Sequence, residues 1–394
     1  MTRIILPLLL LCPVSLADDA ARDAAIKRAI AYLDKNVARM PDSAGTPRKQ
    51  FTYATTGLVY LMSGQSRTGA SRIAPIKKYL VRYVAEVEGR LKDDSNIAAR
   101  SGNFSSNKLI QYTWPIAMTG LFFGELHEHG LYQAEMKKML PRVIAILDAA
   151  QQKNGGWGHH VVLQEKTERA PVPGMAFAGG GYPDTLTAAC NQVAITLGSL
   201  RGVRGIKKSK SIAPAIDYYR EAQLGNGSYG YDASQRSAGQ SKSNPSRTAG
   251  AVYAMLCLGM KRDKTVEKSI DYFMDEFAFL PEGHGSSTLN LWQGALACHA
   301  LGKQQWKRFR EQFEPRIIAN QDEQGHLACI CEKRSFAATN DSEDPFKGRA
   351  GAFWSVGAKT YTTALHTYIL LLDRGNLKLH KPAGKKRTTT KRRR

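Results

Sequence analysis

Cysteine and long apolar runs are both scarce in this chain of 394 residues, and each shortage excludes a class of protein. Of the 6 cysteines only Cys12 precedes residue 18, and the odd number that remains, without regular spacing, argues against a disulfide framework. Cys190, Cys257 and Cys298 lie in apolar helical stretches, where a free cysteine packs as a small core residue. Beyond the N-terminus no stretch is apolar for long enough to cross a membrane, so we predict no integral membrane segment in the mature chain.

The N-terminus has the pattern of a secretory signal peptide. Arg3 supplies a positive charge, residues 4–16 an apolar core, and Ser15-Leu16-Ala17 a cleavage site of the small-x-small type. The alternative is an uncleaved N-terminal anchor. Cleavage divides the chain into a signal peptide at 1–17, a folded region at 18–376 and a tail at 377–394, and we expect a secreted or periplasmic, that is extracytoplasmic, protein.

Acidic residues are too few to balance the basic ones. The sequence has 34 Asp and Glu against 56 Lys and Arg, which gives a formal net charge of +22. Much of the excess lies in the C-terminal tail, where the stretch 381–394 has no acidic residue and no apolar periodicity, so we predict that the tail is disordered. Such a tail binds an anionic polymer or surface through salt-sensitive attraction. The alternative is a solubilising tail without a dedicated partner.

What the chain does have is a repeat of two helical patterns, an amphipathic one and a more uniformly apolar one rich in small residues. The amphipathic stretches cover 20–38, 71–89, 133–151, 210–223, 263–277 and 303–320. The apolar stretches cover 52–64, 107–126, 185–201, 247–259, 287–301 and 359–373. A helix pair cannot bury its own apolar face and must stack on its neighbours. The strict alternation therefore predicts an all-α fold, an (α/α)6 toroid with six outer and six inner helices.

Three of the helix pairs meet at a turn that begins with Gln and contains Gly and an aromatic residue. The turns run from Gln151 to Gly158, from Gln223 to Tyr231 and, in degraded form, from Gln321 to His326. Together with the paired helices, these turns resemble the repeats of the terpenoid cyclases and protein prenyltransferases. In that superfamily the Gln caps backbone groups and the aromatic ring stacks. The resemblance implies structural roles for Gln151, Trp157, Gln223, Tyr229 and Gln321.

The catalytic signatures of this superfamily are missing. Class II terpenoid cyclases protonate a double bond with an Asp-x-Asp-Asp acid, and Asp93-Asp94 in a polar loop is the nearest pair. Matching the zinc site of the prenyltransferases places Ser286, Thr288 and Thr362 at or near ligand positions, and none of them is a good zinc ligand. The Cys-Gly-Glu-Gln of complement-like thioester domains is absent too. We therefore predict no metal and no cofactor.

Loop lengths indicate which rim of the ring carries the function. Four connections from outer to inner helices look long, at 90–106, 152–184, 224–246 and 321–358, whereas the opposite connections look short. Long loops rich in glycine and aromatic residues are usually functional. The inner helices begin at this long-loop rim, so their positive dipole ends face its centre, and a groove there should favour an anionic or acyl oxygen ligand.

Titratable residues gather in the long loop that follows Gln151 and in a second loop before residue 287. One of two adjacent histidines in the first loop can act as a base near neutral pH, with a tyrosine or an aspartate as its partner. Asp184 is also well placed to cap the following helix. The candidate catalytic residues are His159, His160, Tyr182, Asp184 and His284.

Aromatic and polar side chains on the same rim are candidates for binding a ligand. The segment 283–287, Gly-His-Gly-Ser-Ser at a helix start, can present hydroxyl and N–H groups to an anion or simply cap the helix. The stretch 325–331 contains His326, Cys329 and Cys331, and its alternation indicates a short strand rather than a metal site. The candidate ligand-binding residues are Trp157, Asn191, Ser286, Asn290, Trp292, Trp354 and Tyr361.

Three functions are compatible with this pattern. The missing signatures favour a binding or scaffold protein whose ring mouth holds a peptide, a glycan or a prenyl chain. The alternative is an extracytoplasmic enzyme that acts on an anionic polysaccharide or another polymer, an inference by analogy of fold alone. A true terpenoid cyclase is the weakest reading, because its acid is missing. A mouth lined by aliphatic side chains would support a prenyl chain, and one lined by polar side chains a polar polymer.

Overall fold

Twelve α-helices account for most of the part of the chain that the structure describes. The computed structural model describes residues 19–37, 47–64, 70–93, 113–158, 187–231, 244–281, 287–330 and 359–379. Within these ranges there is no β-strand, only two isolated bridges, between Gln223 and Tyr229 and between Gln321 and Leu327. No helix in the same ranges is long and apolar enough to cross a membrane.

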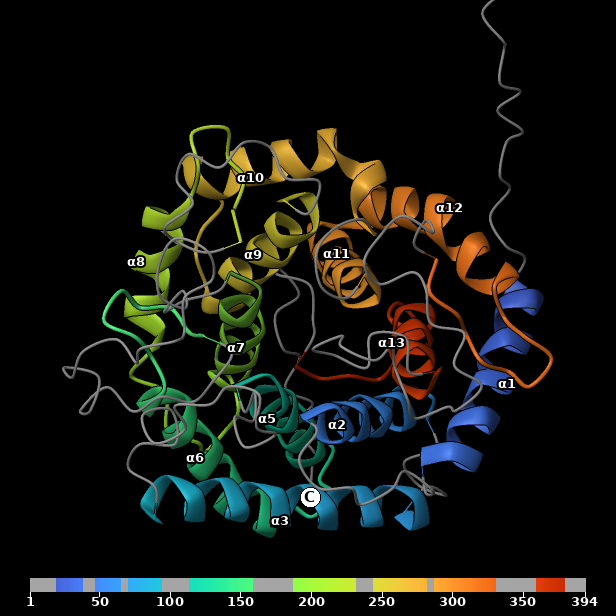
Figure 1. Ribbon diagram of the computed structural model, residues 1–394, viewed down its shortest axis with the longest axis horizontal. Coiled ribbons are helices and arrows are strands. Elements are labelled where there is room, and N and C mark those ends of the chain that lie inside the picture. The colour runs from blue at the N-terminus through green and yellow to red at the C-terminus, as the bar shows by residue number, and fades with distance from the viewer. Residues whose placement is uncertain are drawn as a thin grey trace, which may run out of the picture.

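The helices form two concentric rings (Figure 1). The outer ring consists of α1 (Asp19–Val37), α3 (Ala70–Asp93), α6 (Gln133–Ala149), α8 (Ile212–Ala222), α10 (Lys264–Asp275) and α12 (Lys303–Ala319). The inner ring consists of α2 (Pro47–Met62), α5 (Thr113–Glu128), α7 (Thr187–Leu200), α9 (Asn244–Leu258), α11 (Ser287–Leu301) and α13 (Lys359–Leu371). A short 3-10 helix, η2 (Phe277–Phe279), follows α10. Outer and inner helices alternate along the chain, so the predicted (α/α)6 toroid is confirmed.

Each inner helix packs against the next one, and the last packs against the first. The pairs in contact are α2–α5, α5–α7, α7–α9, α9–α11, α11–α13 and α13–α2. The first outer helix, α1, contacts both α12 and α13. The two ends of the described chain therefore meet at one seam, and the ring is closed there.

The two patterns in the sequence correspond to two patterns of burial. In α1 the buried apolar residues recur every three or four positions, so one stripe of the helix faces the core. In α5 every residue from Thr113 to His127 is buried, as expected for a helix enclosed on most sides. Fully burying one Leu or Phe side chain contributes about 1.5–3 kcal/mol. The inner ring is therefore the main core of the protein.

Local signals set where two of the helices begin. α2 begins at Pro47, five residues before the predicted start, and proline suits the first position of a helix because its missing N–H has no intrahelical partner there. α10 begins after Asp263, whose carboxylate accepts hydrogen bonds from the backbone of Thr265 and Val266 at 3.0 and 3.2 Å.

The three Gln-containing turns share one backbone geometry. The glycine four residues after each Gln has a positive φ, which is 82° at Gly155, 90° at Gly227 and 94° at Gly325. This glycine also approaches the backbone of the next outer helix closely. A Cβ atom at Gly227 would lie 2.4 Å from the carbonyl oxygen of Lys268 in α10, and the other two glycines meet α8 and α1 in the same way. Only glycine suits this position.

Each Gln side chain ties its turn to the next outer helix or the residue before it. The Nε2 atoms of the three glutamines donate to backbone oxygens: Gln151 to Ser211 at 2.9 Å, Gln223 to Thr265 at 2.7 Å, and Gln321 to Ala25 at 2.9 Å. The third bond joins the end of α12 to α1, so the degraded turn closes the outer ring. The structural role that the family resemblance implies for these glutamines is confirmed.

Six residues after each Gln, a backbone N–H ties the turn to an inner helix. The acceptors are Cys190 Sγ for Trp157 at 3.1 Å, Thr248 Oγ1 for Tyr229 at 3.1 Å, and Thr363 Oγ1 for Leu327 at 3.2 Å. In the third turn Leu327 therefore stands where the first two turns have an aromatic residue. The turns thus link three outer helices to α7, α9 and α13.

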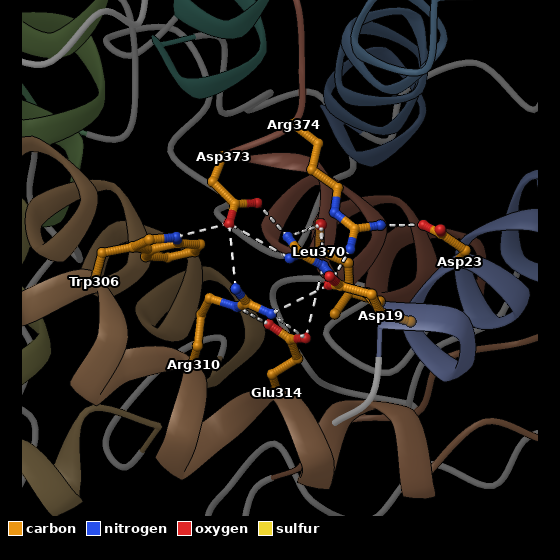
Figure 2. Close-up of polar contacts among 9 residues, drawn as sticks. Asp19, Asp23, Trp306, Arg310, Glu314, Leu370, Asp373 and Arg374 are labelled. Atoms are coloured by element: carbon orange, nitrogen blue, oxygen red, sulfur yellow. Dashed lines mark hydrogen bonds and ion pairs between the residues drawn. The ribbon is translucent and has the colours of Figure 1, made fainter. Parts of the chain in front are cut away.

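A buried ion-pair network holds the seam at the N-terminal end of α1 (Figure 2). Arg22 is fully buried, and its Nε donates to the carbonyl oxygen of Leu370 at 2.8 Å. The same guanidinium pairs with Asp373, and its Nε lies 3.6 Å from Glu314. A carbonyl and two carboxylates therefore compensate this buried cation. Around them, Trp306 Nε1 donates to Asp373 at 3.0 Å.

The last described residues run from α13 to the end of α5. The backbone N–H groups of Lys378 and Leu379 donate to the two carboxylate oxygens of Glu125 at 2.8 and 2.7 Å. Glu125 is fully buried, and a buried carboxylate needs such donors. The sequence places residues 377–379 in a disordered tail, and the structure corrects this boundary, because these residues are fixed on α5.

Candidate functional site

The candidate residues divide between the described ranges and the segments outside them. The candidates that the structure describes are Trp157, Asn191, Asn290, Trp292 and Tyr361. The candidates outside the described residues are His159, His160, Tyr182, Asp184, His284, Ser286 and Trp354.

Trp157 lies between the first turn and the inner ring. Its side chain is fully buried, and its indole N–H donates to the carbonyl oxygen of Leu147 at 2.8 Å. Its backbone N–H meets Cys190 on α7. The indole therefore fixes the end of α6 against the inner ring, as the family resemblance implies.

Asn191 links three helices from the fully buried interior. Its Oδ1 accepts a hydrogen bond from the hydroxyl of Tyr219 on α8 at 2.9 Å, and its Nδ2 donates to the carbonyl oxygen of Arg247 on α9 at 2.9 Å. Burial raises the pKa of Tyr219 well above its ordinary value, so its hydroxyl remains a donor. Both ends of the Asn191 amide are thus used within the protein.

The remaining candidates are buried where α11, α13 and α2 meet. Trp292 packs edge-on against Tyr368 of α13, with ring centroids 5.6 Å apart. Tyr361 of α13 packs against Phe51 of α2, with centroids 5.7 Å apart. Asn290 lies in the first turn of α11 and is also buried. The indole N–H of Trp292 has no hydrogen-bond partner among the described residues.

Trp292 is one of several inner-helix residues with buried, unpartnered polar atoms. Within the described ranges these residues are Thr56, Thr113, Thr119, His127, Gln192, Thr288, Trp292, Gln293 and His366. For Gln192 both amide atoms lack a partner, and for Gln293 the Nε2 atom does. Most of these residues lie in the first two turns of their helices, at the rim where the inner helices begin. Buried polar groups are normally hydrogen-bonded, so this cluster marks a place where a ligand or water would bind.

A glycine in α9 allows one of these amides to reach across the inner ring. A Cβ atom at Gly250 would lie 2.3 Å from Oε1 of Gln293 and 2.6 Å from Nδ2 of Asn191. The side chain of Gln293 therefore extends from α11 over α9 to the neighbourhood of α7. Gln192 follows Asn191 on α7, so the two amides with unpartnered atoms belong to inner helices that both pack against α9.

A second polar cluster lies at the seam, around His326. Its Nδ1 is 3.3 Å from a carboxylate oxygen of Asp322, and its Nε2 is 3.2 Å from the hydroxyl oxygen of Thr362 on α13. The ring of Tyr32 on α1 lies 5.9 Å from the imidazole. In the third turn His326 occupies the position that Gly156 and Ser228 hold in the first two. The first two turns form with Gly or Ser at this position, so the turn geometry does not require the imidazole.

The order carboxylate, imidazole, hydroxyl is the one that activates a hydroxyl nucleophile. The donor and acceptor roles of the imidazole nitrogens follow from the network and are not fixed by distance. The Thr362 hydroxyl is also 3.2 Å from the carbonyl oxygen of Lys359, to which it can donate. In that arrangement the Nε2 atom of His326 donates to the Thr362 hydroxyl oxygen.

His366 lies one turn further along α13 and is fully buried. Burial is the main cause that lowers its pKa to about 3; the backbone of Leu327 and Ala328 opposes this change, and the nearby His326 adds to it. Neither ring nitrogen has a hydrogen bond of good geometry within the described residues. His366 is therefore a neutral imidazole at physiological pH.

The sequence analysis does not single out Gln192, Gln293 or His366. Each is a large polar residue in an inner helix that has few charged residues, and that is the signal that could have found them. Cys329 is disulfide-bonded, so its sulfur is not a free thiolate ligand. No group of three or more His, Cys, Asp or Glu residues in the described ranges is placed to hold a metal ion.

Comparison with known proteins gives a likeness to solved structures only. No family model and no curated protein matches the chain. Among solved structures it is similar to the type II terpene cyclase MstE from Scytonema in its apo form, with a TM-score of 0.48, 14% identity, and coverage of 90% of this chain and 99% of that chain. A single-residue variant of that cyclase gives a TM-score of 0.47 at 14% identity, over 90% of this chain and 98% of that chain. At this identity the likeness concerns the arrangement of helices and says nothing of activity.

Proposed function

We propose that this protein binds a polar ligand inside the ring, at the rim where the inner helices begin, and that it acts outside the cytoplasm after removal of residues 1–17. The observation that carries the binding proposal is the set of buried polar atoms without partners, above all those of Gln192 and Gln293. For the export step, mass spectrometry of the mature chain should place its N-terminus at Asp18, and an intact Met1 would contradict it.

The energetics of these amides favour a ligand that forms hydrogen bonds. A buried polar group without a partner costs about 1–3 kcal/mol, so a ligand that supplies the missing bonds recovers part of that free energy. A primary amide both donates and accepts, which suits the peptide group or the hydroxyls of a sugar and does not suit a hydrocarbon chain. A peptide or a glycan is therefore the ligand class we propose, in preference to a prenyl chain.

The test is a thermal-shift screen of the full-length mature protein with peptides, oligosaccharides and prenyl diphosphates, at low and high salt. A ligand at 100 times its Kd adds about 2.7 kcal/mol to the free energy of unfolding. We expect a peptide or a glycan to raise the unfolding midpoint, and Gln192→Leu and Gln293→Leu to abolish the shift. Gln304→Leu changes an exposed glutamine of α12 and should retain it. A shift with prenyl diphosphates alone, or one that both buried substitutions leave intact, would contradict the proposal.

A second candidate function is catalysis on an anionic polysaccharide, which the arrangement of Asp322, His326 and Thr362 favours. In this reading His326 accepts the proton of the Thr362 hydroxyl, and Asp322 orients the imidazole. Thr362 is buried, so the rim must open for a substrate to reach it. His326→Ser is the sharpest variant, because Ser228 occupies the same position in the second turn and the fold should be kept. If the His326→Ser variant still cleaves the polysaccharide, the proposed catalytic function is wrong.

A further inference from the structure

The connection between α7 and α8, residues 201–211, is strongly basic and contains no acidic residue. It lies at the rim where the inner helices end, opposite the proposed ligand site. Its exposed cationic residues are Arg201, Arg204, Lys207, Lys208 and Lys210. This basic connection is separate from the C-terminal tail to which the sequence analysis assigns the contact with an anionic partner.

The basic connection is fixed to the body of the protein. Every third residue, namely Val203, Ile206 and Ser209, is buried. The Val203 N–H donates to the carbonyl oxygen of Leu200 at 3.0 Å, and the Ser209 hydroxyl bonds the carboxylate of Asp148. The intervening cations are therefore displayed from an ordered backbone, so binding through them costs little chain entropy.

None of the five cations forms an ion pair within the described residues, and four of them also form no side-chain hydrogen bond there. Arg204, Lys207, Lys208 and Lys210 form no ion pair within the described residues, and the nearby Asp148 is engaged by Ser209. The fifth, Arg201, donates to the carbonyl oxygen of Leu258 at the end of α9 at 2.6 Å. A dense group of unpaired like charges repels itself, and an anionic partner relieves that repulsion.

The end of the described chain lies beside the start of the basic connection. A Cβ atom at Gly124 would lie 2.5 Å from Cδ2 of Leu200 and 2.7 Å from Cδ1 of Leu379, so these two leucines share one contact point on α5. Leu200 precedes the basic connection directly. Leu379 precedes the stretch 380–394, which has Lys or Arg at eight positions and no acidic residue. The residues that precede the two most basic stretches of the sequence, Leu200 and Leu379, are therefore close together on α5.

We propose that the basic connection is the binding surface for an anionic polysaccharide, one that carries carboxylate or sulfate groups. The cations follow one another along a single non-helical segment, which matches a linear polymer. Val203 and Ile206 are buried, so the segment offers no exposed apolar side chain for insertion into a lipid surface. It contains no aromatic residue on which a base could stack.

The test compares two full-length variants that lose the same charge. One carries Lys207→Gln, Lys208→Gln and Lys210→Gln in the basic connection. The control carries Lys27→Gln, Lys35→Gln and Lys78→Gln, three exposed lysines of α1 and α3. The probe is heparin, titrated by calorimetry at low and high salt. We expect the first variant to bind about tenfold more weakly and with a smaller salt dependence, and the control to change by less than about twofold.

Two further variants keep the test decisive. Replacing the same three lysines of the basic connection by arginine should retain the affinity, which separates loss of charge from loss of fold. Neutralising the Lys and Arg residues of 381–394 in the full-length chain should leave a residual affinity that still depends on the basic connection. An equal loss in the lysine-to-glutamine variant and its control would overturn the proposal, and so would binding that disappears entirely with the C-terminal charges. Tighter binding to anionic vesicles or to duplex DNA than to heparin would overturn the choice of partner.

Discussion

Two glycines of the second turn differ in whether a Cβ atom could be accommodated. Gly227 has a φ of 90°, and a Cβ atom there would lie 2.4 Å from the carbonyl oxygen of Lys268. Nothing lies within 4 Å of a Cβ atom at Gly225, two residues earlier. The same turn therefore contains one position that tolerates only glycine and one that is open to other residues.

We expect Gly227→Ala to lower the free energy of unfolding by at least about 2 kcal/mol, because the left-handed backbone alone costs about 1–2 kcal/mol and the contact with α10 adds to it. Gly225→Ala should be neutral or stabilise the protein by up to about 1 kcal/mol through the unfolded chain. Urea denaturation of both variants measures the difference. Equal effects at the two positions would refute this account of the turn.

Some residues of the candidate site could not be predicted from the sequence. Gln192 and Gln293 are recognisable only as large polar residues inside inner-helix stretches, and the sequence does not show that both helices pack against α9. His326 is visible in the sequence, but its neighbour Thr362 is 36 positions away. A contact of this kind depends on the closure of the ring and leaves no local pattern.

At the scale of the element, the segment that follows α13 is held by one buried carboxylate, that of Glu125. Burial raises the pKa of Glu125 to about 7 from an ordinary 4.5, although the N–H groups of Lys378 and Leu379 oppose the rise. The folded protein therefore holds a proton that the unfolded chain releases between these two values. The contribution of this proton to stability is fully present below pH 4.5 and is lost as the pH rises to about 7.

Glu125→Gln should remove this dependence on pH. Relative to the unsubstituted protein, the variant should gain roughly 1 kcal/mol in the free energy of unfolding for each pH unit between pH 4.5 and 7. Urea denaturation at several pH values in this window measures the gain. Glu323→Gln, at an exposed position of the third turn, should follow the unsubstituted protein. A constant difference between Glu125→Gln and the unsubstituted protein would contradict the raised pKa.

The helices themselves were the most predictable elements. Amphipathic and apolar stretches alternate so regularly that all twelve described helices coincide with predicted ones. Their starts deviate where a local signal overrides periodicity, as Pro47 does in α2. The boundary of the tail was wrong by three residues, because Lys378 and Leu379 bind a carboxylate about 250 positions away in α5.

At the scale of the whole molecule, the ring depends on one seam between α1 and the last two helices. Arg22 and Arg310 both pair with Glu314 and Asp373, but only the Arg22 side chain is fully buried, whereas that of Arg310 is 19% exposed. Removing one partner from a buried ion-pair network leaves charges without compensation. The seam is therefore the point at which a single substitution should affect the entire fold.

We expect Arg22→Met to lower the free energy of unfolding by about 3 kcal/mol, because Glu314 and Asp373 lose their fully buried cation and keep only the partly exposed Arg310. Lys27→Met, at an exposed position of the same helix, should change it by less than about 0.5 kcal/mol. Hydrogen exchange should quicken in α1 and α13 of the first variant before the other helices. Uniform exchange across the ring, or equal stability of the two variants, would count against the seam.

The seam also dictates an order of events as the chain is made. Arg22 is bonded to Leu370 and Asp373, which lie 348 and 351 positions further along the chain. While the ribosome is still adding the intervening residues, α1 has no partner for its buried arginine, and the growing protein is an open arc with one uncovered edge. Closure must wait for α13, so the first of the described helices to be synthesised is among the last to be enclosed.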